Sequence, residues 1–362
     1  MQKSIQPEPR FLLKGIDSLY VGYSPNFACS ELRFEDLERE KAWLLDDPSR
    51  RRRLIQLGDL MLAMSPSRAY PYRYVLRNRD LTMKLAPKMY PGCYVEFSSE
   101  ALWREGAEAL HHKISRWMAL INASQIRPAT ISRIDVSFDY HWPNADLRQD
   151  HFTSRAKKDS LWRKDNKAET FSFGTSNIVI RIYNKSAEIE QQSQKTWFYD
   201  LWGVKDHVWR IEFQLRKNIL KDSGIQIMSQ IKGPLRALIF KIAENHTTLR
   251  IPNADSNRSR WPLHPLWIDL LKQIENMDSS LGPRPFNGAS ALEYRRDKSL
   301  SSIAGNLKAL AAIESMLTNG CKPLSIEETL ELLEEYTKAE IHDVNWEEGV
   351  KDRIEKYEVG QW

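Results

Sequence analysis

The stretch Ile178-Val-Ile-Arg-Ile-Tyr-Asn-Lys-Ser186 predicts a β-strand that runs directly into a helix. Its isoleucines alternate with Arg181, Tyr183 and Lys185, so one face would pack on a core while the other carries positive charge and a phenol. Asn184 is a helix N-cap residue type, which places Tyr183 where the strand ends. Because backbone N–H groups at a helix start favour anions, this combination suits a phosphate group.

Two further stretches alternate in the same way. Arg133-Ile-Asp-Val-Ser-Phe-Asp-Tyr140 places Asp135 and Asp139 on one face, and Trp209-Arg-Ile-Glu-Phe-Gln-Leu-Arg216 places Glu212 on its polar face. Water on one side of a sheet explains each pattern taken alone. If the three strands are neighbours, however, three carboxylates and a tyrosine converge on one surface. The repulsion between such carboxylates is best relieved by Mg²⁺ or Mn²⁺, which phosphoryl chemistry also uses to neutralise a phosphodiester.

Apolar periodicity and turn residues predict the other elements. Residues 1–13 are interpreted as a loose leader, and Ser325 with Glu328 forms a capping box at the start of an acidic helix. We expect further strands over residues 15–23, 72–77, 81–85, 94–98 and 170–174, and helices within residues 34–64, 99–122, 145–157, 186–201, 266–274 and 326–340. Together these elements predict an α+β protein with curved, mostly antiparallel sheets, helices packed on one face, and a helical C-terminal region.

The composition is that of a soluble globular protein, with 41% hydrophobic and 28% charged residues in a chain of 362. No run of about 18 apolar residues and no signal-peptide pattern is present, so we expect a cytoplasmic protein without a membrane partner. Cys29, Cys93 and Cys321 are far apart, which indicates neither a disulfide framework nor a metal-binding spacing.

Charge is distributed unevenly along the chain. Residues 322–362 hold 5 Lys or Arg against 12 Asp or Glu, a balance of −7, which leaves +12 for the other 321 residues of a chain whose net charge is +5. A basic body is the electrostatic footprint of a nucleic-acid binder, although an unevenly charged, solvated surface would give the same sums.

The three alternating strands together resemble the replication initiation factor family, the Rep_trans-type rolling-circle initiators of plasmids and filamentous phages, with related conjugative relaxases. The resemblance is carried by Arg133-Ile-Asp-Val-Ser-Phe-Asp139, Arg181-Ile-Tyr-Asn-Lys185 and Arg210-Ile-Glu-Phe-Gln-Leu-Arg216, and it covers roughly residues 15–245. The Tyr-Asn-Lys sequence after a strand is the most specific of these motifs.

The resemblance implies a metal-dependent enzyme that nicks and rejoins DNA to start rolling-circle replication. Tyr183 matches the nucleophile, which would attack one phosphodiester, form a 5′-phosphotyrosine link and release a 3′-OH primer. Lys185 and Arg181 would stabilise the phenolate or the phosphate at the reacting centre. A free phenol has a pKa near 10, so metal and cations must help to generate the nucleophile.

The remaining site residues are also implied by the resemblance. Asp135, Asp139 and Glu212 match acidic positions that would hold Mg²⁺ or Mn²⁺, and which of them ligate is left open. Arg210 and Arg216 are the expected DNA contacts. The partners would be DNA, as a double-strand origin and as a single strand, with a host helicase, a polymerase and a second copy of the chain as further candidates.

We expect a DNA-nicking domain over residues 1–250 and a helical region with an acidic end over residues 251–362. One alternative is a non-catalytic, sequence-specific DNA-binding protein, which would need basic residues where three carboxylates stand. A conjugative relaxase is another, although no helix-turn-helix is evident before residue 15. Trp197, Trp202 and Trp209 flank the expected site, and packing in a core is the better interpretation of each than base stacking.

Overall fold

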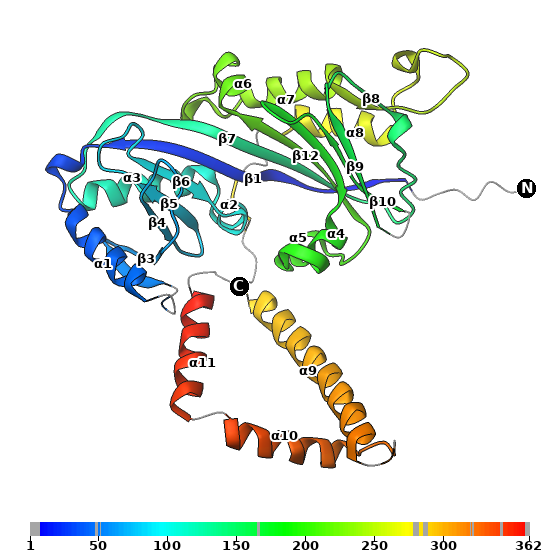
Figure 1. Ribbon diagram of the computed structural model, residues 1–362. Coiled ribbons are helices and arrows are strands. Elements are labelled where there is room, and N and C mark those ends of the chain that lie inside the picture. Colours follow the sequence, from blue (N-terminus) through cyan, green and yellow to red (C-terminus); the bar gives the residue numbers. More distant parts are fainter. Residues whose placement is uncertain are drawn as a thin grey trace, which may run out of the picture. The chain divides into compact units, whose positions relative to one another are not determined.

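The computed structural model describes residues 8–47, 50, 52–164, 167–277, 282–284, 289–318, 320, 322–340 and 343–358 (Figure 1). Contacts divide the chain into a body unit, Met1–Phe286, and a helical unit, Asn287–Trp362. In the described part of the chain, no helix combines the length and the apolar character needed to cross a membrane.

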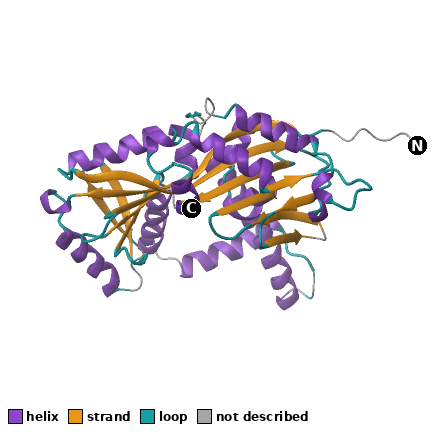
Figure 2. Ribbon diagram, turned by 90° about the horizontal axis from the view of Figure 1, so that it is seen from above, coloured by secondary structure: helices purple, strands orange, loops and turns teal. Residues whose placement is uncertain are grey.

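The body unit is built on one large antiparallel sheet. Its two long strands, β1 (Arg10–Pro25) and β7 (Gln125–His141), pair with each other, and a group of strands attaches to each of them. Figure 2 shows these two groups of strands with helices against them. Next to β7 follow, in order, β12 (Val208–Arg216), β11 (Ile178–Asn184), β10 (Lys167–Phe173) and β9 (Asp159–Lys164); next to β1 follow β6 (Cys93–Phe97), β5 (Leu81–Leu85), β4 (Tyr74–Arg77), β3 (Leu60–Ser65) and β2 (Arg53–Leu57).

Each face of the β7–β12–β11 region has its own hydrophobic core. The alternating apolar residues Phe138, Ile182 and Phe213 join the main core, which also includes side chains of α7 (Pro234–Asn245) and α8 (Pro265–Glu275). A smaller cluster on the other face includes Trp197, Phe198 and Trp202 of α5 (Trp197–Trp202), which follows α4 (Lys185–Glu188) and the π-turn Ile189–Ser193. Figure 1 shows α7 and α8 on one side of these strands and α4 and α5 on the other. The sheet therefore lies between two apolar layers at this point.

The remaining described elements of the body unit complete these layers. They are α1 (Phe34–Asp46), α2 (Ser99–Glu105), α3 (Ala107–Leu120) and α6 (Lys217–Asp222), the 3-10 turns Phe27–Cys29, Gln149–His151, Met228–Gln230 and Arg258–Arg260, and a two-stranded sheet of β8 (Phe152–Ser154) and β13 (Thr247–Leu249).

Several predicted helices are wrong. The helix expected to continue through residue 64 ends with α1, and β2 and β3 follow as a hairpin that turns at Gly58. Leu60, Leu62 and Met64 are buried while Met61 is 49% exposed, as on a strand with one covered face, and the small Ala63 is buried as well. Apolar residues this closely spaced also fit a helical stripe, so the sequence pattern was ambiguous.

Three further boundaries differ from the prediction. Residues 145–157 hold a 3-10 turn and β8 in place of the expected helix. The helix expected over residues 99–122 is interrupted at Gly106, whose φ of +83° ends α2 before α3 begins. The first strand begins at Arg10, so residues 10–13 belong to the sheet and not to a leader.

The α+β class is confirmed, as is the helical C-terminal region. The helical unit contains α9 (Ala289–Thr318), α10 (Ile326–Glu340) and α11 (Asp343–Glu358). At the start of α10 the Ser325 N–H donates to Glu328 Oε2 at 2.7 Å and the Glu328 N–H donates to Ser325 Oγ at 3.1 Å, the capping box expected from the sequence. The functional boundary at residue 250 stays a prediction; by contacts, the body unit extends to Phe286 because α8 packs on α7.

Candidate active site

The registers of β11, β12 and β7 align the polar residues of the three alternating strands. Tyr183 is paired with Arg210, which is paired in turn with Asp139, and the next polar row pairs Arg181 with Glu212. Directly opposed residues of an antiparallel pair project from the same face. The three strands are therefore neighbours whose polar residues share the sheet face that carries α4 and α5.

Tyr183 lies at the junction of strand and helix, partly exposed. Its Oη donates a hydrogen bond to Glu212 Oε2 at 3.1 Å, and Asn184 caps α4 by accepting from the Ala187 N–H at 3.1 Å. Burial, and then the charge of Glu212, raise the pKa of Tyr183 well above its ordinary value. Since α4 spans only Lys185–Glu188, its dipole adds little to anion binding, and the nearby carboxylate is the main influence on the phenol.

Arg210 and Asp139 form a buried ion pair directly beside Tyr183. Both are 0% exposed. The Arg210 Nε donates to Asp139 Oδ1 at 2.7 Å and its Nη2 to Oδ2 at 2.9 Å, while the Trp202 indole N–H also donates to Oδ2 at 2.9 Å. The ring of Phe198 covers the guanidinium at 4.4 Å from its centroid. The structure contradicts the prediction that Arg210 contacts DNA, because no part of its side chain reaches the surface.

Asp17 of β1 is the member of this network that the sequence analysis missed. Its Oδ1 lies 2.9 Å from Arg210 Nη1 and accepts hydrogen bonds from Ser99 Oγ at 2.8 Å and the Trp103 indole at 3.0 Å. Burial alone would raise the pKa of Asp17, but the Arg210 guanidinium holds it well below its ordinary range. The register of the β1–β7 pairing shifts between Ile16 and Ser18, at the position of Asp17. Simple alternation along the strand does not reveal such a shift, so it does not predict the face on which Asp17 lies. The available signal was the Ile-Asp-x-x-[Tyr/Phe] pattern that residues 16–20 of this strand share with residues 134–138 of β7.

Asp135 and Glu212 are the other two carboxylates of the face. Asp135 accepts from Arg133 Nε at 2.9 Å, and Glu212 Oε1 lies 3.5 Å from Arg181 Nη1. Burial raises the pKa of Asp135 to about 6 against the opposing effect of Arg133, and the negative charge of Glu212 adds to the rise. Arg133 and Arg181 also both donate to the Gln214 amide oxygen, so one connected polar surface spans the three strands.

The two predicted cations near Tyr183 differ in access. The Arg181 side chain is 36% exposed and borders the site. Lys185 is 2% exposed, its Nζ donates to Glu188 Oε2, and it lies 5.6 Å from the centroid of the Tyr183 ring. Burial, and then the positive charge of Arg210, lower the pKa of Lys185 to about 8. The Arg181 guanidinium is therefore accessible from solvent, whereas Lys185 is enclosed next to the Tyr183 ring.

Arg216 is exposed at the end of β12, on the same face as Glu212 but about 14 Å farther along the strand. Its predicted role as a DNA contact remains a prediction. The core interpretation of Trp197, Trp202 and Trp209 is consistent with exposures of 4%, 5% and 7%.

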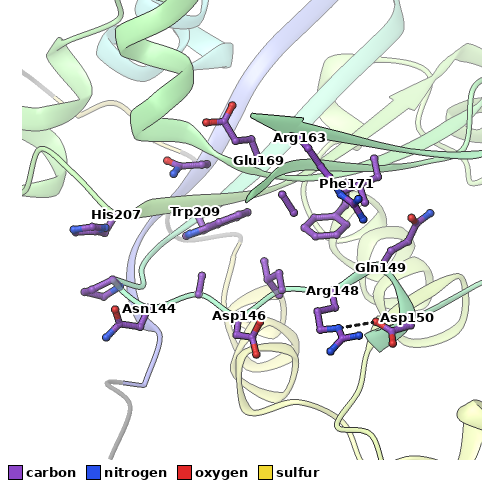
Figure 3. Close-up of a pocket in the computed structure, with 16 residues that line it drawn as sticks. Asn144, Asp146, Arg148, Gln149, Asp150, Arg163, Glu169, Phe171, His207 and Trp209 are labelled. Atoms are coloured by element: carbon purple, nitrogen blue, oxygen red, sulfur yellow. Dashed lines mark ion pairs between the residues drawn. The ribbon is translucent and has the colours of Figure 1, made fainter. Parts of the chain in front are cut away.

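A pocket of about 990 Å³ opens on the opposite side of the sheet from Tyr183 (Figure 3). Asn184 and Trp209, which line it, form the rung next to Tyr183 and Arg210 and project the other way. The Arg148–Asp150 ion pair, at 3.3 Å, lies in its wall. The pocket contains none of the predicted site residues, so the polar face and not this cavity is the candidate site.

A family model described as replication initiation factor matches residues 129–317, just over half of the chain. The chain belongs to the replication initiation factor family. The match contains all three alternating strands and confirms the resemblance carried by their motifs; it begins later and ends later than residues 15–245. A solved structure titled rolling circle replication initiator protein, from Geobacillus stearothermophilus, is similar at 17% identity and a TM-score of 0.43, covering 73% of this chain and 97% of that one. No curated protein matches the chain.

Proposed function

We propose that this replication initiation factor nicks and rejoins one DNA strand at an origin of rolling-circle replication, with Tyr183 as the nucleophile. The observation that carries the proposal is the hydrogen bond from Tyr183 Oη to Glu212 Oε2, at 3.1 Å, on a polar sheet face bordered by Arg181. A phenol that donates to a carboxylate is a nucleophile paired with a base.

The raised pKa of Tyr183 means that almost none of the phenol is ionised at neutral pH, so its proton must leave during the attack. Glu212 lies within hydrogen-bonding reach and would accept that proton as general base. The phenolic oxygen would form a bond to phosphorus while the bond from phosphorus to the 3′-oxygen breaks. The products would be a 5′-phosphotyrosine and a 3′-OH end, and attack by a 3′-OH would reverse the step to rejoin the strand.

The cations have different roles in this scheme. Arg181 would bind the non-bridging phosphate oxygens, where negative charge accumulates in the transition state. Lys185, held under the Tyr183 ring, would stabilise the developing phenolate without touching the DNA. Arg133 and the exposed Arg216 extend the same face and would contact phosphates farther along the strand.

A divalent cation, Mg²⁺ or Mn²⁺, is the expected cofactor. Asp135 and Glu212 fit it, because carboxylate oxygens suit hard cations and the cation would relieve the repulsion that contributes to the raised pKa of Asp135. Asp139 does not fit, since it is 0% exposed and both of its oxygens accept hydrogen bonds from the buried Arg210 and from Trp202. Both oxygens of Asp135 also accept hydrogen bonds, from Arg133, so a cation at Asp135 would have to displace that guanidinium, whose side chain is 23% exposed. When bound, the cation would neutralise the charge of the phosphodiester.

Two carboxylates alone are too few ligands for the cation, so the remaining ligands would be DNA phosphate oxygens and water. Among the described residues, no three His, Cys, Asp or Glu side chains are placed together to hold an ion. Mg²⁺ is commonly held by one or two carboxylates together with substrate phosphate and water, so a two-carboxylate site is sufficient.

The test is a nicking assay on supercoiled DNA that carries the origin of the element encoding this protein, with Mg²⁺, Mn²⁺ or EDTA. We expect wild type to relax the DNA and to form a covalent adduct that survives detergent, and Tyr183→Phe to do neither. Tyr20→Phe is the matched control, because Tyr20 is a partly exposed tyrosine of β1 that contacts Arg133. Nicking by Tyr183→Phe at the wild-type rate would exclude Tyr183, and origin binding without nicking under any metal would favour the non-catalytic DNA-binding alternative.

A further inference from the structure

Trp162 is the most exposed tryptophan that the structure describes. Its exposed fraction is 68%, against 60% for Trp346 and 41% for Trp43. It lies on β9, one of the two edge strands of the large sheet. Because exposing a large aromatic ring to water is unfavourable, we asked whether Trp162 lies where a bound partner would cover it, near Tyr183.

The sheet register places Trp162 in line with Tyr183. Trp162 is paired with Thr170 of β10, and Thr170 is paired with Tyr183 of β11. Directly opposed residues share a face, so the indole and the phenol project from the same side of the sheet. Two strand spacings of about 4.8 Å separate their backbones by about 10 Å.

The surface between and around these two rings is polar and cationic. The next row on the same face pairs Ser160 with Ser172, so small hydroxyl side chains lie on that side of the indole, while on the other side the β9–β10 register shifts between Ala168 and Thr170. Lys157, Lys158 and Lys164 are exposed on β9 and the segment before it. Aromatic rings beside cations, with little bulk between them, are the elements from which single-strand binding surfaces are built.

We propose that Trp162 is a stacking platform for an unpaired base of the DNA strand whose phosphate lies at Tyr183, with the neighbouring lysines contacting its backbone. The proposal rests on the proposed function, since it uses the position of the nicked phosphate. A single strand is the occupant because a paired base keeps its faces stacked inside the duplex, whereas an unpaired base offers one to the indole. A strand from a second protein is disfavoured, since lysines on an edge strand hinder such pairing.

The experiment measures binding separately from cleavage. Tyr183→Phe serves as the background, and each further variant is titrated against a fluorescein-labelled, mixed-sequence single strand of about 12 nucleotides and against a duplex of the same length. We expect Trp162→Ala to weaken single-strand binding between about fivefold and 150-fold, the loss associated with one base–aromatic stack, and to leave duplex binding within about twofold. Trp162→Phe should recover part of the affinity, because phenylalanine keeps an aromatic face.

Trp346→Ala is the matched control, since it removes a tryptophan of similar exposure from the helical unit and should bind the single strand as the background does. Single-strand binding by Trp162→Ala equal to the background would overturn the proposal, as would an equal loss for single strand and duplex. Pairing of β9 with a second protein strand would also overturn it, and would show as association of the protein without DNA that Trp162→Ala abolishes. Failure of the nicking assay alone would reject the function of Tyr183, whereas the binding result stands independently of it.

Discussion

Replacement of Arg210 by methionine tests whether the buried ion pairs hold the site together. Arg210 is 0% exposed and contacts two carboxylates, those of Asp139 and Asp17. Methionine fills a similar volume without charge, so Asp139 loses the guanidinium that pairs with it, and Asp17 keeps only the more distant Lys195, whose Nζ lies 4.0 Å from Asp17 Oδ2. We therefore expect Arg210→Met to destabilise the body unit strongly.

The expected magnitude follows from removing a buried counter-ion while its acidic partners remain. Breaking one buried ion pair by removing a partner costs about 3 to 5 kcal/mol. The two acids keep neutral donors, Trp202 for Asp139 and Ser99 with Trp103 for Asp17, and protonation of one acid limits the loss, so we do not double that range. At about 2.1 cal/mol/K of unfolding entropy per residue, the loss in the unit Met1–Phe286 corresponds to a decrease in Tm of roughly 5 to 8 °C.

The difference in unfolding free energy between wild type and Arg210→Met should also depend on pH. In wild type, Arg210 holds the pKa of Asp17 below its unfolded value, so this contribution is present above the unfolded pKa and is lost only as the pH falls through the lower, folded one. In Arg210→Met the main charge that lowers the pKa of Asp17 is absent, so burial shifts this pKa upward and protonation of Asp17 stabilises the folded state. The difference in unfolding free energy should therefore be smaller at pH 5 than at pH 8.

Urea unfolding followed by tryptophan fluorescence measures the body unit, because all described tryptophans except Trp346 lie in it. Arg181→Met is the control, because the Arg181 side chain is 36% exposed and its guanidinium borders Glu212. Its replacement should change the unfolding free energy by no more than about 1 kcal/mol, and it should lower the nicking rate. Stability of Arg210→Met within about 1 kcal/mol of wild type would refute the reasoning.

Three further predictions concern the base, the metal and the turn before β11. Glu212→Gln should lower the nicking rate by about 10² to 10⁴-fold in quenched time courses with single-strand binding intact; a loss below about tenfold would contradict its role as general base. Because the pKa of Asp135 is raised to about 6, the rate of Mg²⁺-dependent nicking should increase between pH 5 and 7 as this acid ionises. The residual activity of Asp135→Asn should lack this increase, and a pH profile identical to that of wild type would exclude Asp135 as a metal ligand. Gly174→Ala should cost at least about 2 kcal/mol in urea unfolding, since φ is +93° and a Cβ would lie 2.2 Å from the Ile178 carbonyl oxygen, whereas Gly203→Ala, with φ of +68° and open space, should cost about half as much.

Local patterns in the sequence were sufficient for the strands that carry the site. Alternation over Ile178–Asn184 and its two counterparts predicted which residues share the polar face, because side chains of a strand project to opposite sides in turn. Asn184 predicted the strand-to-helix junction, since its side chain caps the first helical turn within three residues. The same local reasoning was wrong over residues 54–64, where closely spaced apolar residues fit both periods.

Alternation along each strand already assigns Tyr183, Arg181 and Arg210 to polar faces, whereas the different roles of these residues follow from the tertiary structure. Arg181 and Arg210 occupy equivalent positions in alternating strands, yet only Arg210 is covered, by the aromatic side chains of α5, and paired with Asp17 from the first strand. Trp162 likewise has no distinguishing local signal among the tryptophans, and it is the order of strands β9, β10 and β11 that aligns it with the phenol. Burial and pairing of a charge depend on segments far away in the sequence, whereas the face on which a residue lies depends only on its neighbours.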